Sequence, residues 1–136
     1  MQLSIINYQL SMFECPARVG RLPEGYDAGR QVFVGIWQEG QPIAVLELLP
    51  GLNGGEVVYL SELIVHRDAR RQGHGGKIVE AVVEFARNEG FGEIQLGVGD
   101  ENPDGLRFWE YCGFVLVHKY DDMSLMKRVL YEKAAD

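Results

Sequence analysis

The chain has 136 residues and a formal net charge of -7, with 13 Lys and Arg against 20 Asp and Glu. This length suits one compact domain, residues 1–136, with a core of its own. The acidic balance argues against nucleic acid as a partner, because phosphate contacts need clustered cations.

Two cysteines and the absence of long apolar runs narrow the class of protein further. Cys15 and Cys112 have neither CxxC nor metal-ligand spacing, so we expect reduced thiols and no bound metal. No apolar run reaches the roughly 20 residues of a membrane helix, and the first residues lack the pattern of an export signal. We therefore expect a cytoplasmic protein without a membrane partner.

The N-terminal third predicts short elements followed by a hairpin. Residues 3–10, "LSIINYQL", predict a strand, residues 11–22 a short helix, and "LPEGYDAGR" a loop. Residues 31–37, "QVFVGIW", and 43–49, "IAVLELL", are rich in β-branched and aromatic side chains. The turn residues between these two runs predict an antiparallel hairpin.

The centre of the chain predicts a strand, a helix and a second strand. Residues 57–65, "VVYLSELIV", are nearly continuous in apolar residues, which is typical of a central strand covered on both faces. After a glycine-rich turn, apolar residues from Ile78 onward recur at three- and four-residue spacings and predict an amphipathic helix that ends near Gly90. Residues 92–98 read as a strand, so this order predicts a parallel pair with a right-handed crossover.

The C-terminal part predicts a short helix and a last hairpin. Asn102 suits a helix N-cap and Pro103 the first helical position, which predicts a helix over 103–112. Residues 114–118 and 124–130 then predict two paired strands. The fold class is therefore mixed α/β, with a mostly antiparallel sheet, one parallel strand–helix–strand crossover and flanking helices.

The glycine-rich turn "RRQGHGGK", residues 70–77, is the strongest local signal. Between a strand and a helix N-terminus, such a turn presents backbone N–H groups and the positive end of the helix dipole to an anion. The alternative is a tight turn with a solvated basic edge. Neither a Walker loop nor a dinucleotide fingerprint fits, because Arg71 stands where the first Walker glycine belongs and Ile78 replaces the Walker hydroxyl and the last dinucleotide glycine.

The turn resembles the (Q/R)xxGx(G/A) motif of the GNAT superfamily of acyl-CoA-dependent N-acyltransferases, whose defining positions are filled by Arg70, Gly73 and Gly75. Residues 101–114, "ENPDGLRFWEYCGF", resemble the second signature of that family, and the likeness extends over about residues 31–131. The resemblance implies a GNAT-like fold and transfer of an acyl group from a CoA thioester to an amine.

Transferred residue by residue, the resemblance implies that three stretches of the chain bind acetyl-CoA. The backbone of the turn would hold the pyrophosphate, with charge added by Arg70 or Arg71; these residues are Arg70, Arg71, Gln72, Gly73, His74, Gly75 and Gly76. The backbone of Leu63, Ile64 and Val65 would bind the pantetheine arm where two strands splay apart. Asn102 and Phe108 complete the coenzyme contacts, although helix capping alone would also explain Asn102.

Transfer to an amine requires a base, because alkylamines are mostly protonated at neutral pH. Glu62 precedes the turn on the central strand, and burial beside apolar neighbours would make its carboxylate a stronger base. A strand-edge or ion-paired glutamate is the alternative reading of Glu62. Glu47 on the preceding strand is the reserve candidate, and it could instead bind the cation of the acceptor.

The proton donor for the leaving thiolate is the weak point. Trp109 occupies a position where many family members have a tyrosine, and its indole has no usable acidity. Tyr111 projects to another side of the helix, so a locally stabilised thiolate, Cys112 or Tyr120 remain alternatives. The histidines form no ligand pattern, and we expect His66 and His74 in exposed loops and His118 near the acceptor.

The sequence therefore predicts an N-acetyltransferase that joins acetyl-CoA and a primary amine, of a small molecule or a protein, in a ternary complex. A catalytically silent acyl-CoA-binding sensor or interaction domain is the alternative. A plain α/β domain without a CoA site is a third reading. A homodimer is left open, since few residues precede the first hairpin and a second subunit could complete the acceptor pocket.

Overall fold

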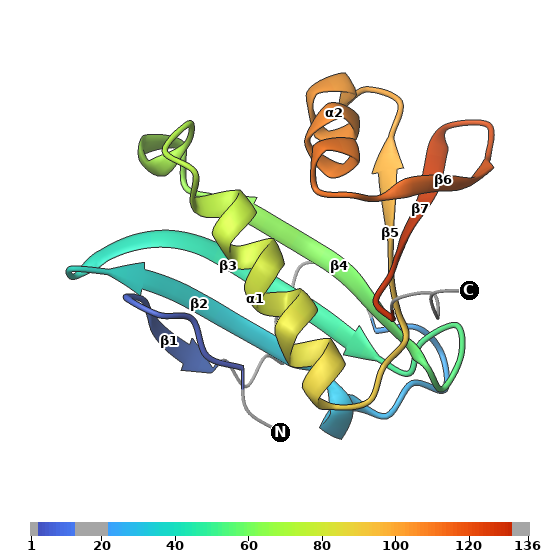
Figure 1. The fold of residues 1–136 in the computed structure, drawn as a ribbon, viewed down its shortest axis with the longest axis horizontal. Coiled ribbons are helices and arrows are strands. Elements are labelled where there is room, and N and C mark those ends of the chain that lie inside the picture. The colour runs from blue at the N-terminus through green and yellow to red at the C-terminus, as the bar shows by residue number, and fades with distance from the viewer. Residues whose placement is uncertain (1–2, 13–21, 132–136) are drawn as a thin grey trace, which may run out of the picture.

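A computed structural model describes residues 3–12 and 22–131 (Figure 1). Its strands are β1 (Gln9–Met12), β2 (Val32–Gln38), β3 (Gln41–Pro50), β4 (Val57–Val65), β5 (Glu93–Gly99), β6 (Val115–Lys119) and β7 (Met123–Val129). Its helices are α1 (His74–Asn88), α2 (Pro103–Tyr111) and the short 3-10 helices η1 (Ala28–Arg30) and η2 (Arg67–Ala69).

The described strands form one sheet in the order β1-β2-β3-β4-β5-β7-β6. β4 and β5 are parallel, whereas every other neighbouring pair is antiparallel. The predicted fold class is thereby confirmed: α1 makes the crossover between the one parallel pair, and hairpins lie on both sides of it.

The parallel pair is short, and the sheet splits beyond it. β4 and β5 are paired only from Val57 opposite Glu93 to Tyr59 opposite Gln95. Figure 1 shows the two strands diverging from there, with β4 running toward the start of α1 and β5 toward α2. The second half of β4 therefore has β3 on one edge and an opening on the other.

A β-bulge marks β4 next to this opening. Glu47 of β3 lies opposite Glu62, but the next pair is Leu48 with Leu60, so Ser61 is an extra residue in β4. A bulge bends its strand and redirects the side chains beside it. It turns the polar side chain of Ser61 toward Glu47 at the place where the sheet opens.

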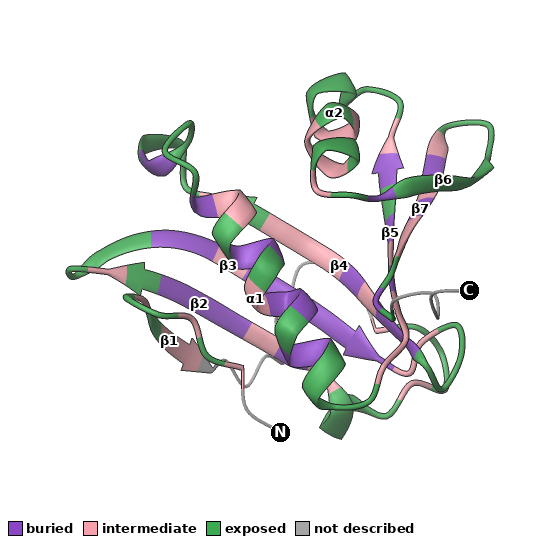
Figure 2. Ribbon diagram, in the orientation of Figure 1, coloured by how far each residue is buried: buried purple, intermediate pink, exposed green. Residues whose placement is uncertain are grey.

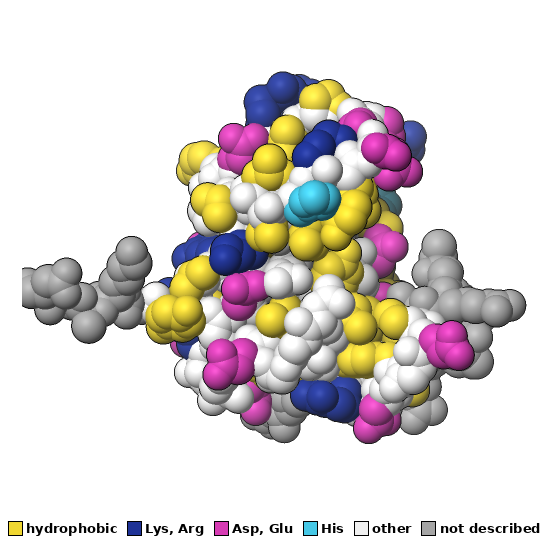
Figure 3. All heavy atoms as spheres, turned by 90° about the vertical axis from the view of Figure 1, so that its right-hand side faces the viewer, with side chains coloured by type: hydrophobic (Ala, Val, Ile, Leu, Met, Phe, Trp, Pro, Cys, Tyr) yellow, Lys and Arg dark blue, Asp and Glu magenta, His cyan; other side chains and the backbone are white. Residues whose placement is uncertain are grey.

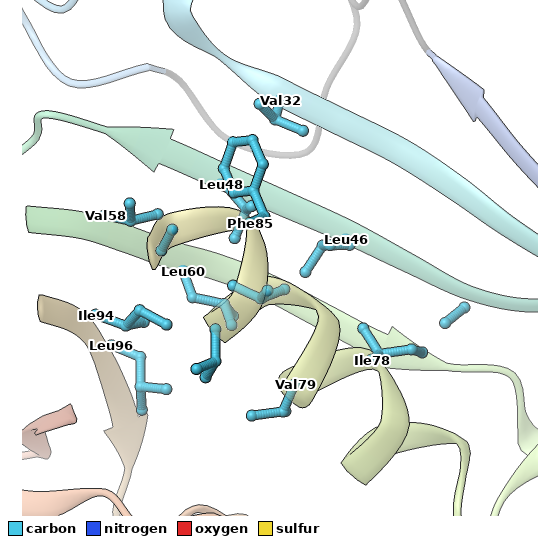
Figure 4. Close-up of a cluster of buried hydrophobic side chains, with 14 of the residues drawn as sticks. Val32, Leu46, Leu48, Val58, Leu60, Ile78, Val79, Phe85, Ile94 and Leu96 are labelled. Atoms are coloured by element: carbon cyan, nitrogen blue, oxygen red, sulfur yellow. The ribbon is translucent and has the colours of Figure 1, made fainter. Parts of the chain in front are cut away.

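The core lies between α1 and the sheet (Figure 2). Ile78, Val79 and Phe85 of α1 are at most 4% exposed and point toward the strands. Figure 4 shows them among side chains of the central strands, namely Leu46, Leu48, Val58, Leu60, Ile94 and Leu96. The three- and four-residue spacing of the apolar residues thus does place one buried face on the helix, as expected from the sequence.

Three expectations at the level of elements are wrong or untested. The first strand is Gln9–Met12, because residues 5–8 form a turn in which Asn7 has a positive φ of 71°. Of the expected helix over 11–22, residues 11–12 belong to β1 and 13–21 lie outside the described residues. The crossover helix starts at His74, within the glycine-rich turn, rather than after it.

β6 forms the outer edge of the sheet, and every residue of it is exposed. β6 and β7 form a hairpin at the right-hand side of Figure 1. Figure 3 views the molecule from that side and shows hydrophobic side chains gathered on this face. The exposed hydrophobic residues of this hairpin include Val115, Leu116, Val117 and Tyr120. None of the helices in the described ranges is long and apolar enough to cross a bilayer.

Candidate functional site

Most of the predicted coenzyme residues line a cavity of about 530 Å³ where β4 leaves β5, beneath the start of α1 and beside α2. Glu62, Ile64 and Gln72 are predicted site residues that do not line it. It is lined by Leu63, Val65, Ala69, Arg70, Arg71, Gly73, His74, Gly75, Gly76, Asn102, Asp104, Gly105, Phe108 and Trp109. A larger cavity of about 630 Å³ lies between α1 and residues 4–8. That cavity shares only Gly76 with the predicted site, so we place the candidate site in the smaller one.

The first turn of α1 leaves its backbone donors open to this cavity. The N-cap is Gly73, with a left-handed φ of 81°, and no side chain caps the helix. The N–H of Lys77 makes the first bond, to the Gly73 carbonyl at 3.4 Å. The N–H groups of Gly73, His74, Gly75 and Gly76 precede this bond and have no acceptor within the helix.

The lack of a side chain leaves open space at two glycines of the turn and permits a close helix contact at a third. A Cβ added to Gly73 or Gly76 would meet nothing within 4 Å. A Cβ on Gly75 would lie 3.0 Å from the Phe108 ring. Gly75 therefore lets α1 and α2 pack closely, while Gly73 and Gly76 leave room for a ligand at the backbone.

The cations of the turn differ in how they are used. Arg70 donates from Nε to the Val65 carbonyl at 3.1 Å. Arg71 has a positive φ of 62°, is exposed, and makes no ion pair with any described residue. Gln72 donates to the Asp68 carbonyl at 3.1 Å and lines a separate cavity of about 420 Å³. Of the turn cations that line the cavity, Arg71 is thus the one with no partner in the described part of the chain.

The backbone of β4 presents alternate residues to the opening. His66 donates its N–H to Ile43 of β3 at 2.6 Å, and Val45 lies opposite Ile64. Since backbone groups alternate in direction along a strand, Ile64 faces β3 whereas Leu63 and Val65 face the opening. Leu63 and Val65 also line the cavity, and Ile64, whose side chain is on the other face, does not.

Asn102 has a structural role that its sequence position predicts. Its Oδ1 accepts a hydrogen bond from the Gly105 N–H at 2.9 Å, and Pro103 follows as the first helical residue. Asn102 is also exposed and lines the cavity. Because the cap uses only the oxygen, the side-chain NH₂ is available to a ligand.

The two candidate carboxylates have opposite environments. Glu47 is fully buried and accepts hydrogen bonds from Ser61 Oγ and, at 2.5 Å, from Gln31 Nε2. Glu62 is half-buried, lies directly opposite Glu47, and has no hydrogen-bond or ion-pair partner among the described residues. Ser61 and Gln31 were not identified from the sequence, since nothing in a strand pattern marks the bulge that brings Ser61 to Glu47.

Trp109 packs in an aromatic cluster. Its ring meets Phe108 at a centroid distance of 4.9 Å and Phe114 at 5.3 Å, both edge to face. The two other candidate acids, Tyr120 and Cys112, do not line the cavity, and burial raises the pKa of the Cys112 thiol. Tyr111, which the sequence had set aside, is 88% exposed. Trp109 is therefore the aromatic residue that stands at the cavity in place of an acid.

The histidines require one correction. His74 is not an exposed loop residue: it is 7% exposed, begins α1, and bonds through Nδ1 to the Tyr8 hydroxyl at 2.6 Å. His66 is exposed and caps η2, and His118 is exposed on β6 with its ring against Tyr120. The described residues hold no cluster of three or more His, Cys, Asp or Glu placed to bind a metal ion.

The known proteins that this chain resembles are acetyltransferases. A family model described as "Acetyltransferase (GNAT) family" matches residues 4–114. The thialysine N-epsilon-acetyltransferase of Mus musculus is 36% identical over 59 residues, which is 43% of this chain and 35% of that protein. The chain therefore matches about a third of the length of this curated relative.

Two solved structures share the fold. An acetyltransferase from Thermus thermophilus superposes with a TM-score of 0.68 at 23% identity, covering 76% of this chain and 66% of that one. A Bacillus subtilis acetyltransferase in complex with CoA gives a TM-score of 0.67 at 20% identity, covering 76% of this chain and 80% of that one. At these identities the likeness concerns the fold alone.

Proposed function

This chain belongs to the acetyltransferase (GNAT) family, and we propose that it transfers an acetyl group from acetyl-CoA to a primary amine by direct attack in a ternary complex. The observation that carries the proposal is the cavity of about 530 Å³ at the split between β4 and β5. Three features meet there: the uncapped N–H groups of α1, the Arg71 side chain, which has no partner among the described residues, and the edge of β4 beyond Tyr59, which pairs with no described strand. The CoA complex of the Bacillus subtilis protein of this fold supports the same donor.

The turn residues would bind the pyrophosphate of the coenzyme. The N–H groups of residues 73–76 and the dipole of α1 favour an anion at this end of the helix. Arg71 adds a full positive charge beside them. Leu63 and Val65, whose backbone groups face the opening, would pair with the amides of the pantetheine arm, and Asn102 would donate its NH₂ group.

Glu62 would act as the general base. Its carboxylate has no partner among the described residues, so it is free to accept a proton from the attacking amine. Glu47 is poorly suited to this role, because hydrogen bonds from Ser61 and Gln31 already occupy its two oxygens. Glu47, which lies opposite Glu62, would instead favour a cationic acceptor.

Acetyl transfer also requires a group that stabilises the carbonyl oxygen and a source of the proton for the leaving thiolate. As the amine nitrogen bonds to the thioester carbonyl carbon, negative charge develops on the carbonyl oxygen, which a backbone N–H at the opening would stabilise. When the carbon–sulfur bond breaks, the electron pair stays on sulfur. Trp109 cannot protonate it, so we propose that the thiolate departs as such and takes its proton from water.

One observation favours a second function. Trp109 is packed between Phe108 and Phe114 where the family resemblance implies an acid, which suits a protein that binds acyl-CoA without turnover. The acceptor remains a class rather than a compound: the mouse relative is named for thialysine, and small amines and protein amines both fit a primary amine. Assembly as a homodimer also stays a prediction.

The donor site is tested by the thermal midpoint of the purified protein with acetyl-CoA, with ATP and NAD as controls. A ligand at about 100 times its Kd adds about 2.7 kcal/mol to the free energy of unfolding, which raises the midpoint by several degrees. A shift with acetyl-CoA alone supports the proposal and justifies a screen of amines for CoA release. An unchanged thermal midpoint at millimolar acetyl-CoA would exclude both the acetyltransferase and the acyl-CoA sensor as functions.

The catalytic base is tested by Glu62→Gln, with Glu56→Gln as control because Glu56 is an exposed carboxylate before β4. We expect Glu62→Gln to lower kcat by at least about 100-fold, the lower end of general base catalysis, with little change in the Kd for acetyl-CoA. Steady-state assays across the pH range measure both. An unchanged kcat at the pH optimum of the variant would exclude Glu62 as the base.

A further inference from the structure

A partly buried contact joins the N-terminal segment to the glycine-rich turn. The Tyr8 hydroxyl lies 2.6 Å from His74 Nδ1, and the two rings meet edge to face at 5.7 Å. His74 is the first residue of α1 and is flanked by Gly73 and Gly75, so its backbone is part of the turn that holds the open N–H groups. A side chain 66 positions away thus contacts the centre of the candidate pyrophosphate site.

The N-terminal segment is held to the body of the protein independently of this contact. Leu3, Ile5 and Leu10 pack against the hydrophobic core. The Asn7 carbonyl accepts a hydrogen bond from Gln38 Nε2 at 3.4 Å. Farther along α1, from Gly76 to Asn88, a cavity of about 630 Å³ separates this segment from the helix. Tyr8 closes the end of that cavity nearest to the turn, so it is a bridge between a fixed segment and the first turn of α1.

The hydrogen bond also sets the orientation of the His74 ring. Burial raises the pKa of the Tyr8 hydroxyl, which keeps its proton and can donate it to Nδ1. A neutral imidazole that accepts at Nδ1 carries its own proton on Nε2. Nε2 has no hydrogen-bond partner among the described residues. Every fully buried polar side-chain atom in that part of the chain does have one, so Nε2 is not fully buried. Nε2 therefore opens onto one of the two cavities that His74 lines.

Glycines make this support necessary. Gly73, Gly75 and Gly76 leave the turn with little side-chain packing of its own, and glycine loses more conformational freedom on ordering than any other residue. His74 is the buried side chain within these four residues. A turn with open N–H groups binds an anion well only when the groups already point to one place.

We propose that Tyr8 and His74 form a tether through which the N-terminal segment fixes the first turn of α1 for coenzyme binding. Both are positioning residues, because they act by holding the backbone N–H groups of residues 73–76 in place. This inference rests on the proposed function, since it takes acetyl-CoA as the ligand of the turn. It adds that affinity for the coenzyme depends on a segment that precedes the motif by more than sixty residues.

The test compares the same Tyr→Phe substitution at two tyrosines in different parts of the fold. Tyr8→Phe removes one hydroxyl and keeps the ring. Tyr26→Phe is the matched control, because the Tyr26 hydroxyl donates one partly buried hydrogen bond, at 2.8 Å, to the Pro50 carbonyl at the far end of β3. Both changes should lower the thermal midpoint by similar amounts. Calorimetric titration with acetyl-CoA should show about a five- to tenfold higher Kd for Tyr8→Phe and no change for Tyr26→Phe.

A second measurement follows the order of the turn in the absence of ligand. Backbone hydrogen exchange of the first turn of α1 should be faster in Tyr8→Phe than in the unmodified protein and unchanged in Tyr26→Phe. In a His74→Phe background, Tyr8→Phe should add little to either readout, because the two residues act as a pair. Equal effects of the two tyrosine changes on Kd and exchange would overturn the tether and leave only general stability.

The two proposals fail in different ways. If the unmodified protein does not bind acetyl-CoA, the proposed function fails and the coenzyme role of the tether fails with it. If the unmodified protein binds acetyl-CoA while Tyr8→Phe binds as tightly and exchanges as slowly, the tether alone is wrong.

Discussion

The two α-helices of this protein begin in opposite ways. The N-cap of α1 is Gly73, which offers no side-chain cap, and the first turn has no acidic residue. The N-cap of α2 is Asn102, whose side chain caps the Gly105 N–H, and Asp104 in the first turn pairs with Arg107. Both starts line the same cavity.

The difference shows where the protein leaves polar groups for a ligand. A helix start has four N–H groups without intrahelical partners, and a cap satisfies some of them within the chain. α2 uses such a cap and balances its dipole with a carboxylate. α1 keeps its donors and the Arg71 charge open, which leaves their pairing to an anionic ligand.

The largest expected effect comes from filling the contact between the two helix starts. Gly75→Val would drive its side chain into the Phe108 ring, which a Cβ alone would approach to 3.0 Å. Overpacking costs about 1–3 kcal/mol, so we expect the Kd for acetyl-CoA to rise up to about 100-fold. Gly55→Val is the control, since a Cβ there would meet nothing within 4 Å. Calorimetric titration of both variants decides whether the close approach of α1 and α2 shapes the site.

A smaller effect comes from removing the open charge at α1. Arg71→Ala should raise the Kd for acetyl-CoA about tenfold, since a hydrogen bond to a charged group contributes about 1.5 kcal/mol or more. Arg67→Ala is the matched control, because Arg67 is an exposed arginine on η2 that does not line the cavity. The effect of Arg71→Ala should shrink as salt is added. A Kd equal to that of Arg67→Ala would mean that Arg71 is only a solvated surface charge.

The smallest effect separates the two roles of Asn102 at α2. Asn102→Ala should lower the free energy of unfolding by about 1 kcal/mol through loss of the cap. Asn102→Asp keeps a capping oxygen but removes the NH₂ donor, so it should retain stability and bind acetyl-CoA a few-fold more weakly. Asp27→Ala, which removes a cap on η1, is the control for stability alone. Unchanged binding by Asn102→Asp would leave Asn102 as a cap only.

Prediction from the sequence succeeded where the signal is local. The spacing of apolar residues identified the crossover helix, and Asn102 and Pro103 marked the start of α2. The start of α1 was misplaced because glycines disfavour a helix interior. They are tolerated in the first turn, where N–H groups have no intrahelical acceptor in any case, and the close approach at Gly75 makes one of them a packing requirement.

The burial of polar groups could not be predicted in the same way. Glu47 is enclosed by Ser61 from β4 and Gln31 from the loop before β2, and His74 is enclosed by Tyr8. These partners are 14, 16 and 66 positions away in the chain. No periodicity relates residues at such separations, since their contact depends on the register of β3 and β4 and on the bulge at Ser61.

The sequence by itself determined the kind of fold, the order of its elements and the turn that carries the family motif, because these depend on local periodicity and on residues at fixed short spacings. Only the tertiary structure decided that the sheet splits after Tyr59 and that Leu63 and Val65 rather than Ile64 face the opening. It also decided that Glu47 is hydrogen-bonded while Glu62 has no partner among the described residues. These features follow from how strands pair, and pairing brings together residues that the chain keeps far apart.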